Sequence, residues 1–239
     1  MPEHTNRTTL ITGANHGVGL ELARQLKARR HHRPPTAPNP DHADELKATL
    51  NAEDRLEQLD VAQDDSCASL AERLADTPIH TLINNAGIGS TKSPITEIDT
   101  HDLAHVLDVN AIGPIRVTRA ILPLMRRAAA RQGSGGLILN ISSQLGSIAN
   151  NTGGSSYAYR SSKAALNMLT KHLAVELEPE GFTVITAHPG WVQTDMGGPN
   201  ATLTPQQSAT SLIENVINPA EPETHNGTFR NYDGTTLPW

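Results

Sequence analysis

TTLITGANHGVGLELARQLK, residues 8–27, places a strand, a glycine-rich turn and a helix in direct succession. Thr8–Ile11 is β-branched and apolar, which predicts a short buried strand. Residues 20–27 have the period and the propensity of a helix. The turn between them carries glycines with the spacing Gly-x-x-x-Gly-x-Gly, not the more general Gly-x-Gly-x-x-Gly. This order of elements predicts a dinucleotide-binding unit.

Each glycine of the turn has a separate expected role. Gly13 permits a tight turn, Gly17 lets a pyrophosphate approach the backbone, and Gly19 lets the helix pack close to the strand. The start of the helix offers free N–H groups and the positive end of its dipole to a phosphate. We therefore expect the phosphates of a cofactor to lie against the turn, with contacts from Gly13, Asn15, His16, Gly17, Val18 and Gly19.

Strand-like and helix-like segments alternate along the rest of the chain. Further strands are expected over residues 56–61, 79–83, 182–187 and 228–231, and from residue 137. Helices are expected over residues 41–51, 64–76, 99–130, 157–178 and 205–217, the third with a bend at Gly113-Pro114. This alternation predicts a parallel sheet with helices on both faces. The expected fold class is α/β, one Rossmann-type doubly wound domain over residues 1–239.

The ends of three strands, the first of which leads into the glycine-rich turn, are expected to face one crevice. The strands in Leu82–Gly87 and Leu137–Ser143 end in small or hydroxyl-bearing residues, and ligands bind beyond the carboxyl ends of such strands. Further along, Tyr159-Arg160-Ser161-Ser162-Lys163 puts a phenol and an ammonium on one face of a predicted helix. A nearby lysine favours the phenolate and is expected to lower the pKa of Tyr159. The pair is therefore a candidate proton donor and acceptor near neutral pH.

Composition limits the classes of function. The hydrophobic fraction of 37% is enough for one core, and the net charge of −6 argues against a nucleic-acid-binding protein. Cys67 is the one cysteine, so no internal disulfide is expected, and the eleven histidines form no metal-ligand pattern. No segment approaches the roughly 20 apolar residues of a membrane span, and residues 1–7 lack a signal-peptide core. We expect a cytoplasmic protein without a membrane partner or a catalytic metal.

Together these motifs resemble the short-chain dehydrogenase/reductase family, in the order that the family has them and over nearly the whole chain. The residues that carry the resemblance are Thr12-Gly13-x-x-x-Gly17-x-Gly19, Asn84-Asn85-Ala86-Gly87, Asn110, Ser143, Tyr159-x-x-x-Lys163 and Pro189-Gly190-x-x-x-Thr194. The blocks Ser142–Ile148, Tyr157–Asn167 and Asn231–Trp239 are similar to the branch that contains sniffer-type carbonyl reductases and the bacterial C-signal protein.

The resemblance implies a role for each residue of the crevice. Tyr159 would be the general acid and base, and Lys163 would lower its pKa and bind the nicotinamide ribose. Ser143 would polarise the carbonyl group of the substrate, and Asn110 would hold a water that links Lys163 to solvent. Two alternatives remain: Ser142 in place of Ser143, and Tyr157 in place of Tyr159, although only Tyr159 has the four-residue spacing to Lys163. The other implied cofactor contacts are Asp60, Val61, Asn85, Ala86, Gly87, Pro189, Gly190, Val192 and Thr194.

The family places its second strand in Arg29–Pro40, which here has four prolines and no Val, Ile or Leu. Three interpretations compete: a short, weakened strand, an extended polyproline-like crossing, or disorder. The end of this strand discriminates the nicotinamide cofactors, and Ala37 or Pro38 stands there. Neither accepts a hydrogen bond from a ribose hydroxyl. No carboxylate of this segment precedes Asp41, whereas His16, Arg30 and Arg33 are basic. NADP(H) is therefore favoured over NAD(H). Asp60 is either an adenine contact or a turn residue.

The preferred functional hypothesis is an oxidoreductase, most simply a carbonyl reductase, that moves a hydride between a nicotinamide cofactor and a small carbonyl or alcohol substrate. Leu145, Trp191 and Met196 are candidates for the pocket lining, and residues 150–156 are expected to border its mouth. A non-enzymatic dinucleotide-binding regulator of the C-signal type is the alternative, and a nucleotide-sugar epimerase is a third possibility that the short chain disfavours. Residues 102–130 and 157–178 suggest contacts in a homo-oligomer.

Overall fold

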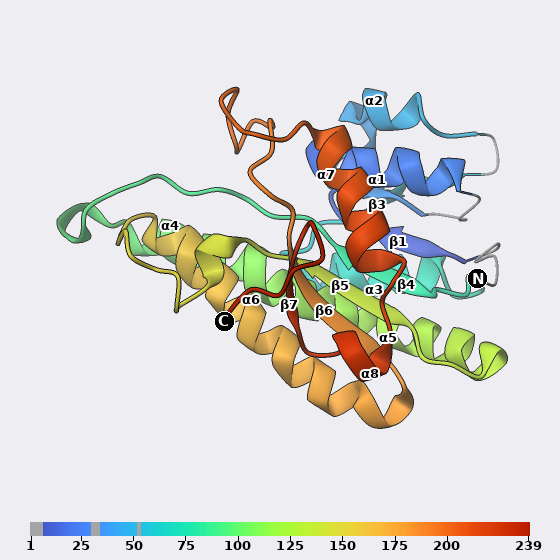
Figure 1. Cartoon of the computed structure of the whole chain (residues 1–239). Coiled ribbons are helices and arrows are strands. Elements are labelled where there is room, and N and C mark those ends of the chain that lie inside the picture. Colours follow the sequence, from blue (N-terminus) through green and yellow to red (C-terminus); the bar gives the residue numbers. More distant parts are fainter. Residues whose placement is uncertain (1–6, 30–33, 52–53) are drawn as a thin grey trace.

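The computed structural model describes residues 7–29, 34–51 and 54–239 (Figure 1). A parallel five-stranded sheet has the order β1-β4-β5-β6-β7, and β2 and β3 form a separate parallel pair. The strands are β1 (Thr9–Ile11), β2 (Thr36–Ala37), β3 (Glu57–Gln58), β4 (Thr81–Asn84), β5 (Leu137–Ile141), β6 (Thr183–His188) and β7 (Phe229–Asn231). The helices are α1 (Gly17–Ala28), α2 (Asp44–Lys47), α3 (Asp64–Arg73), α4 (Thr100–Leu107), α5 (Gly113–Gln132), α6 (Tyr157–Leu177), α7 (Pro205–Leu212) and α8 (Pro222–His225).

Apolar residues form rows across both faces of the sheet. The register aligns Leu10, Leu82, Ile138 and Val184 in one row, and these pack in a cluster with residues of α3, α5 and α6. The adjacent row, Ile11, Ile83, Leu139 and Ile185, packs with α1 and α7 on the other face (Figure 1). Each such side chain contributes roughly 1.5–3 kcal/mol through burial. The α/β doubly wound class is therefore confirmed.

The second strand persists in a short form, which confirms the first of the three interpretations. Thr36 and Ala37 are buried, and the Thr36 hydroxyl donates to the Ile11 carbonyl at 3.3 Å. The Ala14 amide donates to the Thr36 carbonyl at 2.9 Å, and Pro35 forms an isolated bridge with Ile11. These bonds hold β2 beside β1 although proline supplies no N–H on either side of the strand. Arg30 and Arg33, which could meet a phosphate, lie outside the described residues.

Several expected elements are shorter than their sequence patterns. The expected helix over residues 41–51 is a 3₁₀ turn, Pro40–His42, followed by α2. The expected strand over residues 56–61 is reduced to β3, because β2 offers it only two residues to pair with. The long helix over residues 99–130 is divided by a π-helical turn, Asp108–Ile112, directly before the predicted bend at Gly113-Pro114. A second π-turn, Ile213–Ile217, completes the segment expected as one helix with α7.

None of the helices in the described ranges combines the length and the apolar character that crossing a bilayer requires.

Candidate active site

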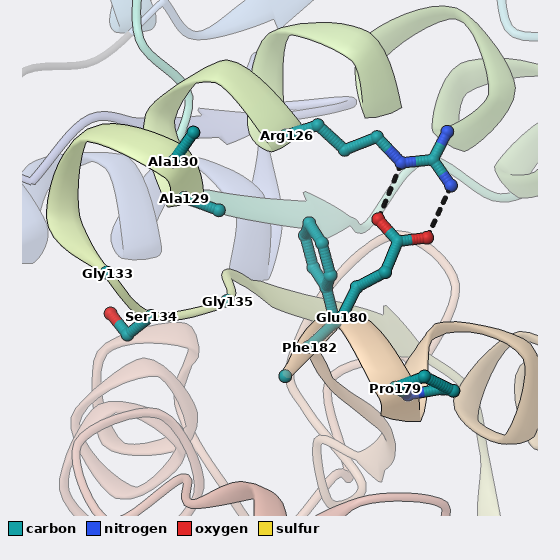
Figure 2. Close-up of a pocket in the computed structure, with 10 residues that line it drawn as sticks. Arg126, Ala129, Ala130, Gly133, Ser134, Gly135, Pro179, Glu180 and Phe182 are labelled. Carbon is teal, nitrogen blue, oxygen red and sulfur yellow. Dashed lines mark hydrogen bonds and ion pairs between the residues drawn. The ribbon is translucent and has the colours of Figure 1, made fainter.

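A hollow of about 540 Å³ lies at the amino edge of the sheet, between the end of α5 and the turn that enters β6 (Figure 2). Its two charged side chains, Arg126 and Glu180, pair with each other through bonds of 2.6 and 2.7 Å. The two charges therefore neutralise each other, and we do not place the candidate site in this hollow. The residues singled out by the sequence gather at the opposite, carboxyl edge of the strands, and the candidate site is built there.

The segments after β1 and β4 are tied together at this edge. The Thr12 hydroxyl accepts hydrogen bonds from the amides of Asn85 and Ala86, both at 3.0 Å. The Asn85 side chain donates in return to the carbonyls of Thr12 and Gly13, at 3.1 and 2.9 Å. Asn85 therefore shapes the glycine-rich turn through its side chain, which is a structural task beside its expected cofactor contact.

Close packing explains why the turn needs its glycines. Gly13 and Gly17 have φ values of +62° and +56°, in the left-handed region that favours glycine. A Cβ atom on Gly13 would lie 2.8 Å from the Ala86 Cα. A Cβ atom on Gly19 would lie 2.4 Å from both the Asn85 Nδ2 and the Gly13 carbonyl oxygen. The turn therefore packs closely against the segment after β4.

The start of α1 fits a phosphate group. His16 precedes the helix in an extended conformation, and its side chain makes no capping hydrogen bond. The first turn of α1 contains no acidic residue. The first hydrogen bond of the helix runs from the Leu20 amide to the His16 carbonyl, at 3.2 Å. The amides of residues 17–19 precede that bond and can donate outward. Together with the helix dipole they form a cradle for the pyrophosphate of a dinucleotide.

Tyr159 and Lys163 lie one turn apart on α6. The Lys163 ammonium nitrogen lies 5.7 Å from the centroid of the Tyr159 ring and donates to the Ile141 carbonyl at 3.0 Å. The Tyr159 amide donates to the Ser90 hydroxyl at 3.2 Å, which joins the start of α6 to the segment after β4. Ser143 follows β5, and its side chain lies close enough to the Tyr159 phenol to lower the pKa of that phenol. The structure thus brings Ser143, Tyr159 and Lys163 together.

Burial dominates the proton affinities of the pair. It raises the pKa of the Tyr159 phenol, an effect that the hydrogen bond with Ser143 partly opposes. It also lowers the pKa of the Lys163 ammonium to about 8. The pKa of Tyr159 is therefore raised overall and not lowered, because desolvation disfavours the charged form of both groups, and the stabilisation of the phenolate by Lys163 stays a prediction. At neutral pH the phenol keeps its proton.

Asn110 lies on the π-turn between α4 and α5 and is fully buried. Its side-chain amide donates to the Ile88 carbonyl at 2.9 Å and to the Ser162 hydroxyl at 3.0 Å, and its oxygen accepts from the Ile88 amide at 2.8 Å. A Cβ atom on Gly87 would lie 3.1 Å from the Asn110 oxygen and 3.5 Å from the Lys163 ammonium nitrogen. The absence of that side chain leaves a position within hydrogen-bond reach of both groups.

The geometry separates the two alternative residue pairs. The Ser142 hydroxyl is buried and bonded to Asn167 at 2.8 Å and to the Lys163 carbonyl at 3.4 Å, so it faces the interior of the protein. Tyr157 is 40% exposed at the first position of α6, whereas Tyr159 is part-buried beside Ser143 and Lys163. Ser143 and Tyr159 are thus the pair that meets.

A sequence model described as "short chain dehydrogenase" matches residues 7–203. The chain belongs to the short-chain dehydrogenase family. C-signal of Myxococcus xanthus is 44% identical over 171 residues, which cover 72% of this chain and 99% of C-signal. The solved structure of the carbonyl reductase Sniffer of D. melanogaster superposes with a TM-score of 0.91 at 36% identity and covers 99% of this chain and 100% of its own. NADPH-bound carbonyl reductase from chicken fatty liver gives 0.88 at 32% identity, with coverages of 98% and 95%.

This short-chain dehydrogenase is accordingly an NAD(P)-dependent oxidoreductase that acts on C=O and CH–OH groups. Its remaining expected cofactor contacts lie on the same edge. Gly190 has a φ of +86°, and a Cβ atom there would lie 2.4 Å from Leu203. Thr194 faces the glycine-rich turn, because its methyl carbon would lie 3.1 Å from a Cβ atom on Gly17. The other members of this set are Pro189, whose carbonyl accepts from Ser208 at 2.6 Å, and the buried Val192.

Asp60 and Val61 follow β3. Asp60 forms a turn in which its carboxylate accepts from the Ala62 amide at 2.9 Å, while its own amide donates to the Ser66 hydroxyl at 2.9 Å. Val61 packs against Gly113, where a Cβ atom would lie 3.0 Å from the Val61 Cγ2. The turn role of Asp60 is thus present in the structure, and an adenine contact stays a prediction.

Two of the three residues expected to line the substrate pocket are exposed. Trp191 and Met196 are 50% and 53% exposed, while Leu145 is half-buried. The indole of Trp191 donates to the Gly197 carbonyl at 2.8 Å, and a Cβ atom on Gly89 would lie 3.4 Å from the Met196 Cγ. The segment after β6 therefore reaches across to the segment after β4.

Sequence reasoning missed a buried amide ladder beneath the site. The Asn84 amide donates to the Asn140 oxygen at 2.8 Å and to the Thr118 hydroxyl at 3.2 Å, and the Asn140 amide donates to the Thr170 hydroxyl at 2.9 Å. The ladder joins β4 and β5 to α5 and to α6, the helix that carries Lys163. The signal was present in the sequence: each of two apolar strands contains an asparagine that burial alone does not favour.

Proposed function

We propose that this chain is an NADP(H)-dependent carbonyl reductase whose single domain holds both the cofactor and the substrate. The observation that carries the proposal is the meeting of the Ser143 and Tyr159 side chains beside a buried Lys163. Two neighbouring hydroxyl groups can both donate to one carbonyl oxygen. Because the Tyr159 phenol keeps its proton at neutral pH, the site is set to give a proton, which is the reductive direction.

A nicotinamide cofactor held against the glycine-rich turn and the start of α1 would supply the hydride for this reduction. Ser143 donates a hydrogen bond to the carbonyl oxygen and holds it as negative charge develops there. Tyr159 transfers its phenolic proton to that oxygen, which yields the alcohol. The cationic Lys163 stabilises the phenolate that remains. A water held between Asn110 and Lys163, at the position that Gly87 leaves open, would return a proton to this pair from solvent.

The cofactor preference rests on the end of β2 and on the start of α1. Ala37 and Pro38 offer no carboxylate to a ribose hydroxyl, and His16 is exposed beside the phosphate cradle. A histidine and an uncharged strand end tolerate a 2′-phosphate, whereas an acidic residue would repel it. Solved relatives with NADPH or NADP bound add support to the proposal.

A thermal-shift titration with NADPH and NADH side by side tests this preference. At about one hundred times its Kd, a ligand stabilises by roughly 2.7 kcal/mol, which for this size of protein raises Tm by roughly 5–10 °C. We expect that rise with NADPH and a clearly smaller one with NADH at equal concentration. Equal rises, or a rise with NADH alone, would refute the preference. A rise with neither would refute cofactor binding itself.

The non-enzymatic regulator of the C-signal type is the weaker alternative. A protein that only binds a dinucleotide has no need of a buried Lys163, of Asn110 held in a π-turn, or of the space that Gly87 leaves between them. All three features are present together here. We therefore place catalysis first.

We further propose that the protein forms homo-oligomers through α6. Met168 and Val175, seven residues apart on this helix, are each 61% exposed. Ile112, the last residue of the π-turn that contacts α6, is 46% exposed. Light scattering should give a mass of two or more times the single-chain mass of 25.6 kDa. A Met168→Glu/Val175→Glu variant should return the single-chain mass. A wild-type protein that is monomeric at micromolar concentration would rule this out.

A further inference from the structure

The loop between β5 and α6 connects the two hydroxyl-bearing residues of the site. Ser143 precedes the short helical turn Gln144–Gly146, and Tyr159 lies at the start of α6. Gly146 is packed tightly against α6, since a Cβ atom there would lie 2.7 Å from the Lys163 carbonyl carbon. Residues 147–155 complete the connection. A contact that fixes these residues therefore also helps to fix the positions of Ser143 and Tyr159 relative to each other.

Within the described ranges, residues 147–155 make one hydrogen bond to a distant part of the chain. The Ala149 amide donates to the Trp239 carbonyl at 3.0 Å. The other bonds of this segment are local, such as that from the Asn150 amide to the Ser147 hydroxyl at 3.2 Å. The segment ends at Ser156, a non-glycine residue with a φ of +58°. A left-handed serine persists where its surroundings hold it, so this end of the loop is a constrained one.

Trp239 is brought to the loop by a return of the chain after β7. Gly234 has a φ of +85° and turns the chain, Thr236 bridges Arg230 in antiparallel fashion, and the Leu237 amide donates to the Phe229 carbonyl at 2.8 Å. The Trp239 ring then stacks on the buried Phe229, with ring centroids 5.6 Å apart and an interplanar angle of 24°. Figure 1 shows the dark-red segment that makes this return. The stacked ring fixes the carbonyl that Ala149 uses.

We propose that Trp239 is a positioning residue for the active site: its stack on Phe229 anchors residues 147–155 and thereby holds Ser143 and Tyr159 at their working separation. The indole is 38% exposed and is no member of the catalytic group. The anchor itself is a property of the structure, while its effect on turnover rests on the proposed carbonyl reduction.

The first arm of the test measures amide hydrogen exchange and needs no substrate. Wild type, Trp239→Ala, Trp239→Phe and Arg126→Ala are compared, the last as a control at the opposite edge of the sheet. In Trp239→Ala, peptides that cover residues 147–156 should exchange about three- to tenfold faster, the size expected for the loss of one aromatic pair. Peptides from β1 and α1 should be unchanged, and Trp239→Phe should restore most of the protection. Unchanged exchange of residues 147–156 in Trp239→Ala overturns the proposal.

The second arm measures reduction of 4-nitrobenzaldehyde with NADPH. Trp239→Ala should lower kcat/KM for the aldehyde by a similar factor, with the Kd of NADPH unchanged, and Trp239→Phe should recover it. Faster exchange with a wild-type kcat/KM would show that the loop does not position the site, which also overturns the proposal. A parallel loss of NADPH affinity would indicate general damage and count against it. If the wild type itself reduces no aldehyde, the proposed function fails, and the exchange arm still decides whether Trp239 is the anchor.

Discussion

Replacement of Tyr159 by Phe is expected to lower kcat for carbonyl reduction by about 10²–10⁴-fold, the range that general acid–base groups contribute. The substitution removes one hydroxyl group and leaves the ring in place beside Ser143 and Lys163. Because burial raises the pKa of Tyr159, the group is protonated at neutral pH, and the loss is that of a proton donor. Binding of NADPH and Tm should change little, since the turn and the start of α1 are untouched.

Tyr157→Phe is the matched control for this result. Tyr157 lies two residues earlier on the same helix and is 40% exposed. Its variant should keep kcat within about twofold of wild type, as expected for a surface substitution. Stopped-flow measurement of NADPH oxidation with 4-nitrobenzaldehyde separates the two variants. If Tyr157→Phe abolishes turnover and Tyr159→Phe does not, the roles assigned to the two phenols are reversed.

The sequence is informative about this fold where chemistry forces a local choice. Gly13 and Gly17 adopt positive φ values, and a Cβ atom on Gly19 would lie 2.4 Å from its neighbours, so the turn could be recognised from its residues alone. The four-residue spacing of Tyr159 and Lys163 likewise requires that both side chains share one face of a helix. The apolar strands were predictable because parallel strands buried on both faces must be apolar.

The remaining features depend on partners that are distant in sequence. β3 is short because β2 is short, and the pattern of residues 56–61 contains no information about that partner. The pKa of Tyr159 follows from how deeply the site is buried, and the sequence shows only the neighbouring charge. The bond between Ala149 and Trp239 joins residues 90 positions apart, and no local signal marks it. Local chemistry was therefore predictable, whereas lengths, burial and long-range anchors were not.

Replacement of Lys163 by Met is expected to lower kcat by about 100-fold or more and to remove a pH dependence of the wild type. Burial lowers the pKa of Lys163 to about 8, so the ammonium loses its charge as the pH rises through that value. The pKa of Tyr159 is raised, so its phenol keeps its proton across the same interval. Wild-type kcat/KM for NADPH, which reports the free enzyme, should therefore be level at pH 7 and fall above about pH 8.

Lys163→Met should show a low rate that stays level between pH 7 and 9.5, because the titrating charge is gone. Its Tm should be maintained or raised, since an apolar side chain of similar length replaces a buried cation. Lys171→Met is the control: it lies two turns further along α6, is exposed, and donates to the Gly227 carbonyl at 3.3 Å. That variant should keep the wild-type profile. A Lys163→Met enzyme that still loses activity above pH 8 would place the titrating group elsewhere, and one with full activity would remove Lys163 from the mechanism.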